Sequence, residues 1–412
     1  MNDDMRKQAL DYHMLPSPGK ISVVPTKKVS NQNDLSLCYT PGVAVPVMEI
    51  AKNSDLAYDY TSKSNLIGII TNGTAVLGLG NVGALASKPV MEGKSNLFKV
   101  FADVDSFDIE VNCDDVDDFI GTVTNISPTF GGINLEDIKA PECFYIEEQL
   151  KSSLNIPVMH DDQHGTAIVV AAGLLNALHL QNKTLDSSKI VCVGAGAAGI
   201  ATMSLLIKLG ARQDNLFLVD SKGVIHTKRH DLNKYKMALA NTTHVRTLQE
   251  AIDGADVFIG VSGPGVVDKA MIKSMAEKPT IFALSNPTPE ISPEEIKSVR
   301  SDAVIATGRS DYPNQVNNAL CFPYIFRGAL DARATCINYE MQMAAVHAIK
   351  DLARQDVPLE ILQAYELEKL EFGFDYILPK LLDKRLKESV SKAVYKAYLD
   401  SRSDTDNSVN KN

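Results

Sequence analysis

The sequence predicts an α/β protein with two parallel-sheet units and a C-terminal helical segment. Residues 131–167 contain an apolar run, a helical stretch and a second apolar run, which is the order of a βαβ unit. Residues 189–220 contain an apolar strand, a glycine-rich turn, a helix and another strand. After Arg327, apolar residues recur at helical spacing. The expected divisions are an N-terminal α/β domain over residues 1–164, a doubly wound domain over 165–330, a helical segment over 331–400 and a disordered tail over 401–412.

Composition limits the classes of function. The chain has 412 residues, of which 45% are hydrophobic and 22% charged, and this suits two or three globular domains. A net charge of -10 argues against a nucleic-acid partner. The N-terminus lacks the apolar core of a signal peptide, and no stretch is long and apolar enough for a membrane span. Six scattered cysteines without a close pair indicate reduced thiols, so we expect a cytoplasmic protein with no membrane partner.

Two acidic pairs follow successive strands of the predicted βαβ unit. The first apolar run ends in Glu136 and Asp137, a helical stretch covers Pro141 to Ser153, and the second apolar run ends in Asp161 and Asp162. A crossover of this kind makes the two strands parallel neighbours, so their carboxyl ends meet at one edge of the sheet. Four carboxylates at one edge would repel one another unless a cation lay between them.

Oxygen ligands without a thiolate or imidazole cluster suit Mg²⁺ or Mn²⁺, and we expect a catalytic divalent metal at this edge. The alternative is that the four acids only cap the following helices or interact favourably with the N-terminal ends of the helix dipoles. Spacing alone does not decide between the two interpretations. His160 and His164 flank the second acidic pair, and we expect them to form hydrogen bonds there because hard cations prefer oxygen.

The first hundred residues offer weaker signals. Residues 1–35 contain no recognisable chemistry. Tyr39 precedes a Thr-Pro-Gly turn that could hold its side chain over a cleft, although packing is the commoner role of such a tyrosine. Lys94 lies between a glycine and an apolar run, where burial would lower its pKa and make it a base; a surface lysine is the commoner reading. Residues 78–83 spell GxGxxG, but a proline follows early and no acid ends a second strand, so we interpret them as a turn near the substrate.

The second glycine motif has the complete context of a Rossmann fold. A strand begins at about Lys189, a helix of small and apolar residues follows the glycines, and the next strand ends in Asp220. The helix N-terminus is suited to a pyrophosphate. Asp220 favours NAD, whereas Lys228 and Arg229 could hold the 2′-phosphate of NADP, so the cofactor choice stays open. The expected pyrophosphate-binding residues are Gly194, Ala195, Gly196, Ala197, Ala198 and Gly199.

Three further strands of this domain end in loops that belong at a binding edge. Asn286, Asn317 and Asn318 lie in these loops, and neutral amides suit a carboxylate or a carboxamide, although each asparagine alone is a weak signal. The pattern after Arg327 predicts amphipathic packing helices.

Eight motifs occur in an order that resembles the malic enzyme family. The resemblance runs from about residue 10 to residue 395. The chain is similar in particular to the malic enzyme portion of bacterial proteins that have an additional acyltransferase-like domain, and we expect no such domain in this sequence. The motifs are SLCYTPGVA, TNGTAVLGLGNVG, KPVMEGKSNLFK, NLEDIKAPECF, HDDQHGTA, VGAGAAG, LSNPTPE and YPNQVNN.

The resemblance implies an enzyme that oxidatively decarboxylates (S)-malate to pyruvate and CO₂ while reducing NAD or NADP. It favours NADP as the cofactor, and it implies that the enzyme forms a homodimer. Tyr39 would be the general acid and Lys94 the general base that takes the proton of the C2 hydroxyl. Asp161 would form a hydrogen bond near Lys94 and help set its protonation. Asn286 and Asn318 would face the substrate and the nicotinamide.

The resemblance also assigns the metal and cofactor ligands. Glu136, Asp137 and Asp162 would bind Mg²⁺ or Mn²⁺. The turn from Gly194 to Gly199 would bind the pyrophosphate, and Asp220 would lie beside the adenine ribose.

One position departs from the larger eukaryotic-type enzymes. Where those proteins have an arginine that binds a substrate carboxylate, this chain has Ala75. Asparagines and the backbone amides of Gly73 or Thr74 are the expected substitutes. Three rival functions stay open: a malolactic-type enzyme that releases lactate and retains its cofactor, a decarboxylating dehydrogenase for an isocitrate-like acid, and a catalytically silent nucleotide-sensing module. This chain has no obvious arginine cluster to bind the third carboxylate of an isocitrate-like acid. A catalytically silent module would not need the acid, base and metal residues together.

Overall fold

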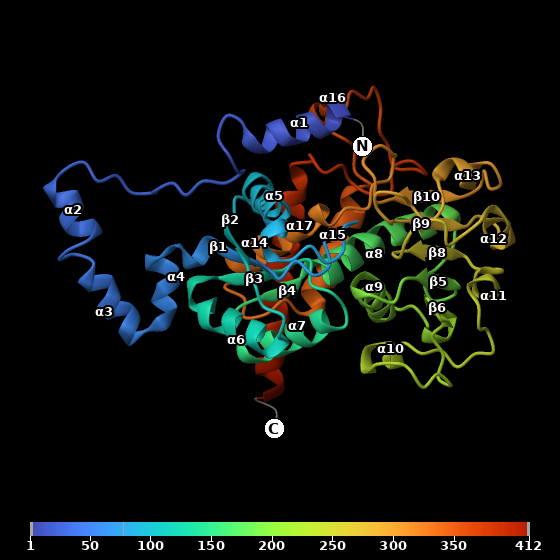
Figure 1. Cartoon of the computed structure of the whole chain (residues 1–412), viewed down its shortest axis with the longest axis horizontal. Helices are drawn as coiled ribbons and strands as arrows, with labels where there is room; N and C mark the ends of the chain where they lie inside the picture. Colours follow the sequence, from blue (N-terminus) through green and yellow to red (C-terminus); the bar gives the residue numbers. More distant parts are fainter. Residues whose placement is uncertain (1–2, 77, 410–412) are drawn as a thin grey trace.

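Two sheets of mainly parallel strands, side by side along the long axis of the molecule, form the framework of the chain (Figure 1). The computed structural model describes residues 3–76 and 78–409, with side chains as far as residue 403. Helices cover both sheets, and the α/β class predicted from the sequence is confirmed.

The first sheet has the strand order β2-β1-β3-β4, and all its strands are parallel. Its central strand β1 is buried along its whole length, as expected for a parallel strand covered on both faces. The predicted βαβ unit is β3, α7 and β4. The strands are β1 (Leu66–Thr71), β2 (Asp105–Glu110), β3 (Gly132–Leu135) and β4 (Val158–His160).

The second sheet has the strand order β10-β9-β8-β5-β6-β7, in which β7 alone is antiparallel. Its order changes direction at β5, so the turn after β5 lies where doubly wound folds bind their ligands. The strands are β5 (Ile190–Val193), β6 (Leu216–Asp220), β7 (Gly223–Val224), β8 (Val257–Gly260), β9 (Thr280–Ala283) and β10 (Val304–Thr307).

Helices connect and cover the strands. Those of the first half are α1 (Asp3–Met14), α2 (Gln32–Cys38), α3 (Ala44–Lys52), α4 (Ala57–Tyr60), α5 (Ala84–Ala102), α6 (Val116–Ile126), α7 (Glu142–Ser153) and α8 (Asp161–Gln181). Those of the second half are α9 (Ala197–Lys208), α10 (Lys234–Ala238), α11 (Leu248–Ile252), α12 (Lys269–Ser274), α13 (Pro293–Lys297), α14 (Phe322–Asp331), α15 (Tyr339–Leu352), α16 (Leu359–Ala364) and α17 (Arg385–Val409). No helix in the described part of the chain is long and apolar enough to cross a membrane.

The long helix α8 links the two sheets. Its residues are apolar on nearly every face because it packs against α9, α15 and β9 at once. This helix begins at Asp161, directly after β4. The acidic pair therefore lies in the first helical turn, where the helix dipole stabilises carboxylates.

The C-terminal helices return to the first sheet. Helix α14 packs against α5, where the ring of Phe98 lies 4.9 Å from that of Phe322 and 5.6 Å from that of Phe326. Helix α17 packs on α14 and α15, and it continues to Val409. It thus enters the segment for which composition predicted disorder, of which residues 410–412 lie outside the described part.

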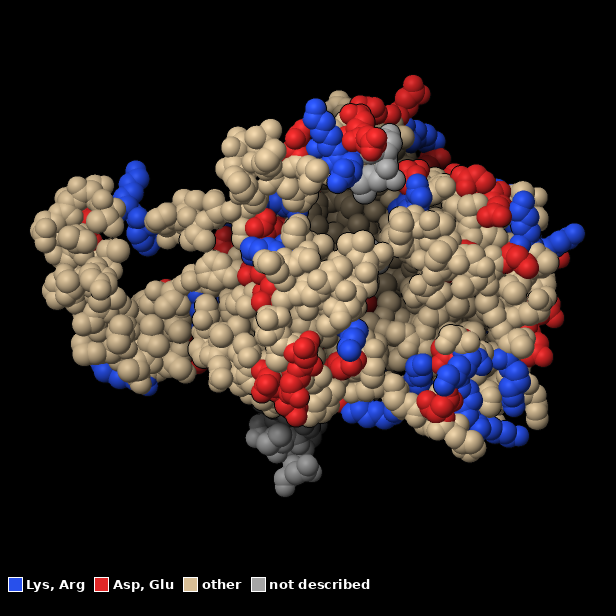
Figure 2. Space-filling model, viewed as in Figure 1, with Lys and Arg blue, Asp and Glu red and all other residues tan. Residues whose placement is uncertain are grey.

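Helices α2 and α3 form an arm that extends away from the body of the molecule (Figure 1). None of the residues of α2, α3 or α4 is buried. The visible face of the arm has few charged side chains (Figure 2). Its exposed large apolar side chains are Leu35, Leu37, Tyr39, Val43, Val45, Val47 and Met48.

Candidate active site

A cavity of about 1240 Å³ lies between the two sheets, and the surface is hollowed there (Figure 2). The first half of the chain contributes acidic and basic side chains to its lining, and the second half contributes glycine-rich turns and amides. Of the residues predicted for the site, the cavity is lined by Lys94, Glu136, Asp137, Asp162, Gly196, Ala197, Ala198, Asn286 and Asn318.

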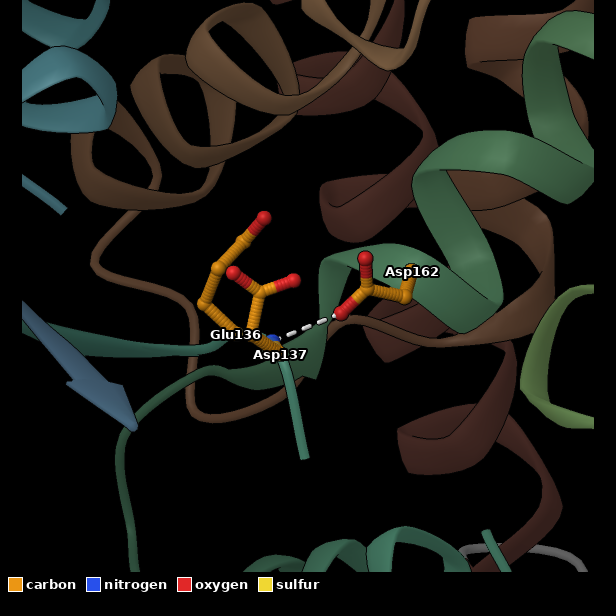
Figure 3. A group of neighbouring side chains, drawn as sticks. All are labelled: Glu136, Asp137 and Asp162. Carbon is orange, nitrogen blue, oxygen red and sulfur yellow. Dashed lines mark hydrogen bonds between the residues drawn. The ribbon is translucent and has the colours of Figure 1, made fainter. Parts of the chain in front are cut away.

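Glu136, Asp137 and Asp162 point toward one another at the carboxyl end of the first sheet (Figure 3). Each offers a carboxylate oxygen, and these oxygens lie within 4.8 Å of one another. The backbone N–H of Asp137 donates to Asp162 Oδ2 at 2.9 Å, and Asn134 Nδ2 donates to Glu136 Oε2 at 2.9 Å. Asp137 Oδ2 is buried without a hydrogen-bond partner among the described residues. This set of oxygens fits a hard divalent cation.

The electrostatics of this acidic group favour a cation as well. Burial, and then the charge of Asp162, raise the pKa of Asp137 to about 7. Burial raises the pKa of Glu136 as well, with Lys94 acting in the opposite direction. Both shifts express the cost of holding carboxylates together away from water, and a divalent ion would remove that cost.

Lys94 enters the cavity from the middle of α5 and is only 8% exposed. Its Nζ lies 2.6 Å from Asp161 Oδ2, 2.8 Å from Glu136 Oε1 and 4.0 Å from the centre of the Phe322 ring. Burial lowers the pKa of Lys94, but Asp161 and Glu136 outweigh it and raise the pKa above its ordinary value. From the sequence we expected burial to lower this pKa. The two carboxylates reverse the direction, and a bound cation would oppose them.

Asp161 pairs with Lys94 and lies outside the group of three acids formed by Glu136, Asp137 and Asp162. It accepts hydrogen bonds from Lys94 Nζ at 2.6 Å and from Asn318 Nδ2 at 2.5 Å. Gly165 makes room for it, since a Cβ at that position would lie 1.9 Å from Asp161 Oδ1. The contact with Lys94 that the resemblance implied is present. Asn318 is held by Asp161 while it lines the cavity.

Glu147, on α7, is a structural residue that the sequence did not point to. Its carboxylate accepts from the backbone N–H of His160 at 2.9 Å, lies 2.9 Å from His164 Nε2 and pairs with Lys151 Nζ at 2.8 Å. Glu147 therefore fixes the junction of β4 and α8, and Asp162 projects from the first turn of α8. His160 is the last residue of β4 and His164 lies at the start of α8, and neither belongs to the group of metal-binding geometry. The only signal in the sequence is Lys151 one helical turn after an acid.

The turn between β5 and α9 has the shape of a phosphate cradle. Gly194 has φ +112°, and a Cβ there would lie 2.4 Å from the carbonyl oxygen of Val261. A Cβ at Gly199 would lie 1.8 Å from the carbonyl oxygen of Gly194, so the helix approaches the strand closely. Nothing lies within 4 Å of the corresponding position at Gly196, which leaves space at the helix N-terminus for an anion. Ala195 lies within this turn and is only partly exposed.

Asp220 ends β6, as predicted, but its carboxylate already has partners. Arg229 donates to both of its oxygens at 2.8 and 3.1 Å, and Lys236 Nζ lies 2.8 Å from Oδ2. Burial raises the pKa of Asp220, but hydrogen bonds from Arg229 and Lys236 outweigh it and hold the pKa at about 2. Lys and Arg side chains gather on this part of the surface around α10 (Figure 2).

Of the predicted catalytic residues, Lys94 lines the cavity and Asp161 contacts Lys94, whereas Tyr39 lies away from both. It lies on the arm between α2 and α3, is 69% exposed and is not among the residues that line the cavity in the described part. Conversely, Tyr12 and Lys20 do line the cavity, although residues 1–35 offered no recognisable chemistry. A lysine directly after a Pro-Gly turn was the only available signal for Lys20.

The position of Ala75 explains part of the departure noted in the sequence. Its backbone N–H donates to the carbonyl oxygen of Asp137 at 2.9 Å, so the segment is tied to the metal group without a charged side chain. The amide of Gly73 donates to Thr71 Oγ1 at 2.9 Å and is therefore engaged. Thr74 Oγ1 donates to the side chain of Asn72. The expected use of the Gly73 amide for a substrate carboxylate is thus not supported by this geometry.

Comparisons with known proteins match most of the chain. Residues 18–151 match the family model described as "Malic enzyme, N-terminal domain", and residues 163–365 match "Malic enzyme, NAD binding domain". An NADP-dependent malic enzyme of Halomonas elongata is 58% identical, over 97% of this chain and 95% of that one. A probable NADP-dependent malic enzyme of Rickettsia prowazekii is also 58% identical, but this chain spans 53% of its length. The crystal structure of malic enzyme from Pyrococcus horikoshii superposes with a TM-score of 0.88 at 42% identity, covering 96% of this chain and 91% of that one.

Proposed function

Because the chain belongs to the malic enzyme family, we propose that it catalyses the oxidative decarboxylation of (S)-malate to pyruvate and CO₂ with reduction of NADP. One observation supports this most strongly: a buried lysine, a group of three acidic residues and a dinucleotide cradle face the same cavity. Hydride transfer and decarboxylation at neighbouring carbons need these three parts within reach of one small substrate.

Glu136, Asp137 and Asp162 would hold the divalent metal ion. The ion, when bound, would polarise the C2 oxygen of malate and stabilise the negative charge that develops there as CO₂ leaves. Mg²⁺ and Mn²⁺ both suit three carboxylates. Within the protein, the backbone N–H of Asp137 fixes the Asp162 carboxylate before any ion arrives.

Lys94 would receive the proton of the C2 hydroxyl as hydride leaves C2 for the nicotinamide. Asp161 orients the ammonium from one side and Phe322 limits its motion from the other. The same aspartate accepts from Asn318, so the base and one cavity amide are fixed by a single carboxylate. Loss of CO₂ then leaves C3 in need of a proton, for which Tyr39 is the acid that the family resemblance implies.

Residues around Asp220 support NADP as the preferred cofactor. An aspartate that selects NAD must accept hydrogen bonds from the ribose hydroxyls. Here the carboxylate is bound by Arg229 and Lys236, and both cations remain beside the place where a 2′-phosphate would lie. The related proteins from Halomonas and Rickettsia are named as NADP-dependent.

Tyr39 requires a second copy of the chain under this proposal. The arm exposes apolar side chains that a single chain leaves uncovered, and Tyr39 lies among them, away from the cavity. In a homodimer these apolar surfaces would be buried, and each arm would bring Tyr39 toward the cavity of its partner. The active site would then be shared between subunits.

A coupled assay tests the function directly. The full chain is mixed with (S)-malate and Mn²⁺, with NAD or NADP in separate samples, and both reduced cofactor and pyruvate are measured. We expect the two products to appear in equal amounts, and faster with NADP. Lactate without reduced cofactor would instead identify a malolactic enzyme. Absence of either product would contradict the proposal and favour a nucleotide-binding module.

A further inference from the structure

Three lysines line the cavity, and among its described lining residues there is no arginine or histidine. Lys94 pairs with Glu136 and Asp161, and Lys139 Nζ lies 3.1 Å from Glu142. The third, Lys20, has no carboxylate within ion-pair distance among the described residues. Its Nζ donates only to the carbonyl oxygen of Pro89, at 2.5 Å. Lys20 is therefore the cavity cation whose charge is not already balanced.

Helix α5 holds Lys20 in place. The backbone N–H of Lys20 donates to Glu92 Oε2 at 3.0 Å, 72 positions along the chain. The preceding Gly19 has φ +86°, a conformation that glycine adopts readily, and a Cβ there would lie 3.3 Å from Glu92 Oε1. The turn thus depends on a glycine and on one carboxylate of α5, and both direct the lysine toward the cavity.

The lysine lies beside the helix that supplies the base. An ideal Cβ on Gly93 would lie 3.5 Å from Lys20 Nζ, and Gly93 directly precedes Lys94. A glycine in the middle of a helix is destabilising relative to alanine. At this position the glycine allows the ammonium to lie against the helix backbone. Among the described residues, the hydrogen-bond partners of Lys20 are Glu92 and Pro89, which both belong to α5.

The charges of the substrate demand such a group. Malate has two carboxylates, and a divalent ion held by three ionised carboxylates has no net positive charge left to balance them. Ala75 offers none, the amide of Gly73 is engaged by Thr71, and the amide of Asn318 is held by Asp161. A carboxylate that enters a partly desolvated cavity needs a cation or several donors.

We propose that Lys20 binds the carboxylate of malate that the metal does not hold, in place of the arginine that Ala75 lacks. The inference rests on the proposed function, since it assigns a residue to the same substrate. It makes the N-terminal segment part of the substrate site. Burial lowers the pKa of Lys20 in the absence of substrate, with Glu92 acting in the opposite direction, and a bound carboxylate would favour the charged form.

The test compares ligands that differ by one carboxylate. Binding of tartronate, a hydroxy acid with two carboxylates, and of glycolate, which has one, is measured by calorimetry in Mn²⁺ with NADP present. In Lys20→Met we expect tartronate to bind about 10- to 100-fold more weakly and glycolate to bind within about twofold of wild type. Lys20→Arg should recover most of the loss. The matched control is Lys27→Met, an exposed lysine of the same segment.

Kinetics provide a second readout. We expect Lys20→Met to raise the KM for malate by a similar factor while the Kd for NADP stays unchanged. Equal weakening of tartronate and glycolate would show that Lys20 only shapes the segment, and an unchanged tartronate affinity would exclude it from the site; either result overturns the inference. Because the ligand comparison needs no turnover, an inactive wild type would contradict the proposed function without deciding the role of Lys20.

Discussion

The ammonium of Lys94 lies 2.6 Å from Asp161 Oδ2, which joins the middle of α5 to the first turn of α8 across 67 positions of sequence. Both groups are buried, and the same lysine reaches Glu136 in the metal group at 2.8 Å. One side chain thus connects the proposed base to the proposed metal site.

Lys94→Met should lower kcat for malate oxidation by at least about 100-fold, because general bases contribute roughly 10²- to 10⁴-fold. The Kd for NADP, measured by fluorescence quenching, should not change. Lys99→Met is the control, since Lys99 lies on the same helix but is exposed. A kcat near that of wild type would remove Lys94 from the mechanism.

Asp162→Asn should weaken Mn²⁺ binding by about 10- to 100-fold, because a charged ligand becomes neutral while its shape is kept. Electron paramagnetic resonance of free Mn²⁺ measures this affinity without turnover. Glu142→Gln serves as the control, since this nearby acid pairs with Lys139 and lies outside the group of three. Unaltered Mn²⁺ affinity in Asp162→Asn would contradict the ligand assignment.

Tyr39→Phe and Lys94→Met should complement each other if the site is shared. Each variant alone should be nearly inactive. An equimolar mixture that is unfolded and refolded together should recover about a quarter of wild-type activity, because half of random dimers are hybrids with one complete site each. The same mixture combined after separate refolding is the control. Recovery of no activity would place Tyr39 in its own chain's site or outside the chemistry.

Arg229→Ala should reduce the affinity for NADP by about tenfold or more, because a charge-assisted contact with a phosphate is lost. The affinity for NAD should stay the same or increase, since Asp220 would be partly released. Lys234→Ala is the control, because that lysine pairs with the exposed Glu148. Equal losses for both nucleotides would show that Arg229 only maintains the fold.

Glu147→Gln should lower the free energy of unfolding at neutral pH by about 1–3 kcal/mol, since a buried charged acceptor loses its charge. Burial raises the pKa of Glu147, but His164 and Lys151 outweigh it and hold the pKa well below its ordinary value. Such a carboxylate stabilises the fold above its unfolded pKa of about 4.3, and that stability is lost as pH falls toward the lowered folded value.

The difference between wild type and Glu147→Gln should therefore be largest at neutral pH and shrink below about pH 4. Urea unfolding at several pH values measures it. Glu148→Gln, at the exposed neighbouring position, should show no such dependence. If the difference in unfolding free energy between wild type and Glu147→Gln stays constant with pH, the charge of Glu147 does not stabilise the junction of β4 and α8.

Local patterns determined much of this protein. The strand, glycines, helix and terminal acid around Gly194 to Gly199 predicted the second sheet because each has a fixed backbone requirement. The βαβ unit placed Glu136 and Asp162 just after the carboxyl ends of neighbouring parallel strands, because a short crossover leaves no other arrangement. The α/β class and the malic enzyme family were both predicted in this way and are confirmed.

Only the tertiary structure decided the contacts between distant segments. The pKa of Lys94 depends on carboxylates 42 and 67 positions away, and Asp220 depends on how Arg229 and Lys236 fold back on it. Lys20 is held at the cavity by two hydrogen bonds to α5, and Tyr39 does not reach the cavity in a single chain. Periodicity and motif spacing describe the backbone nearby. They contain no information about charges that meet only after the sheets and helices have packed, and these charges set the protonation and selectivity of the site.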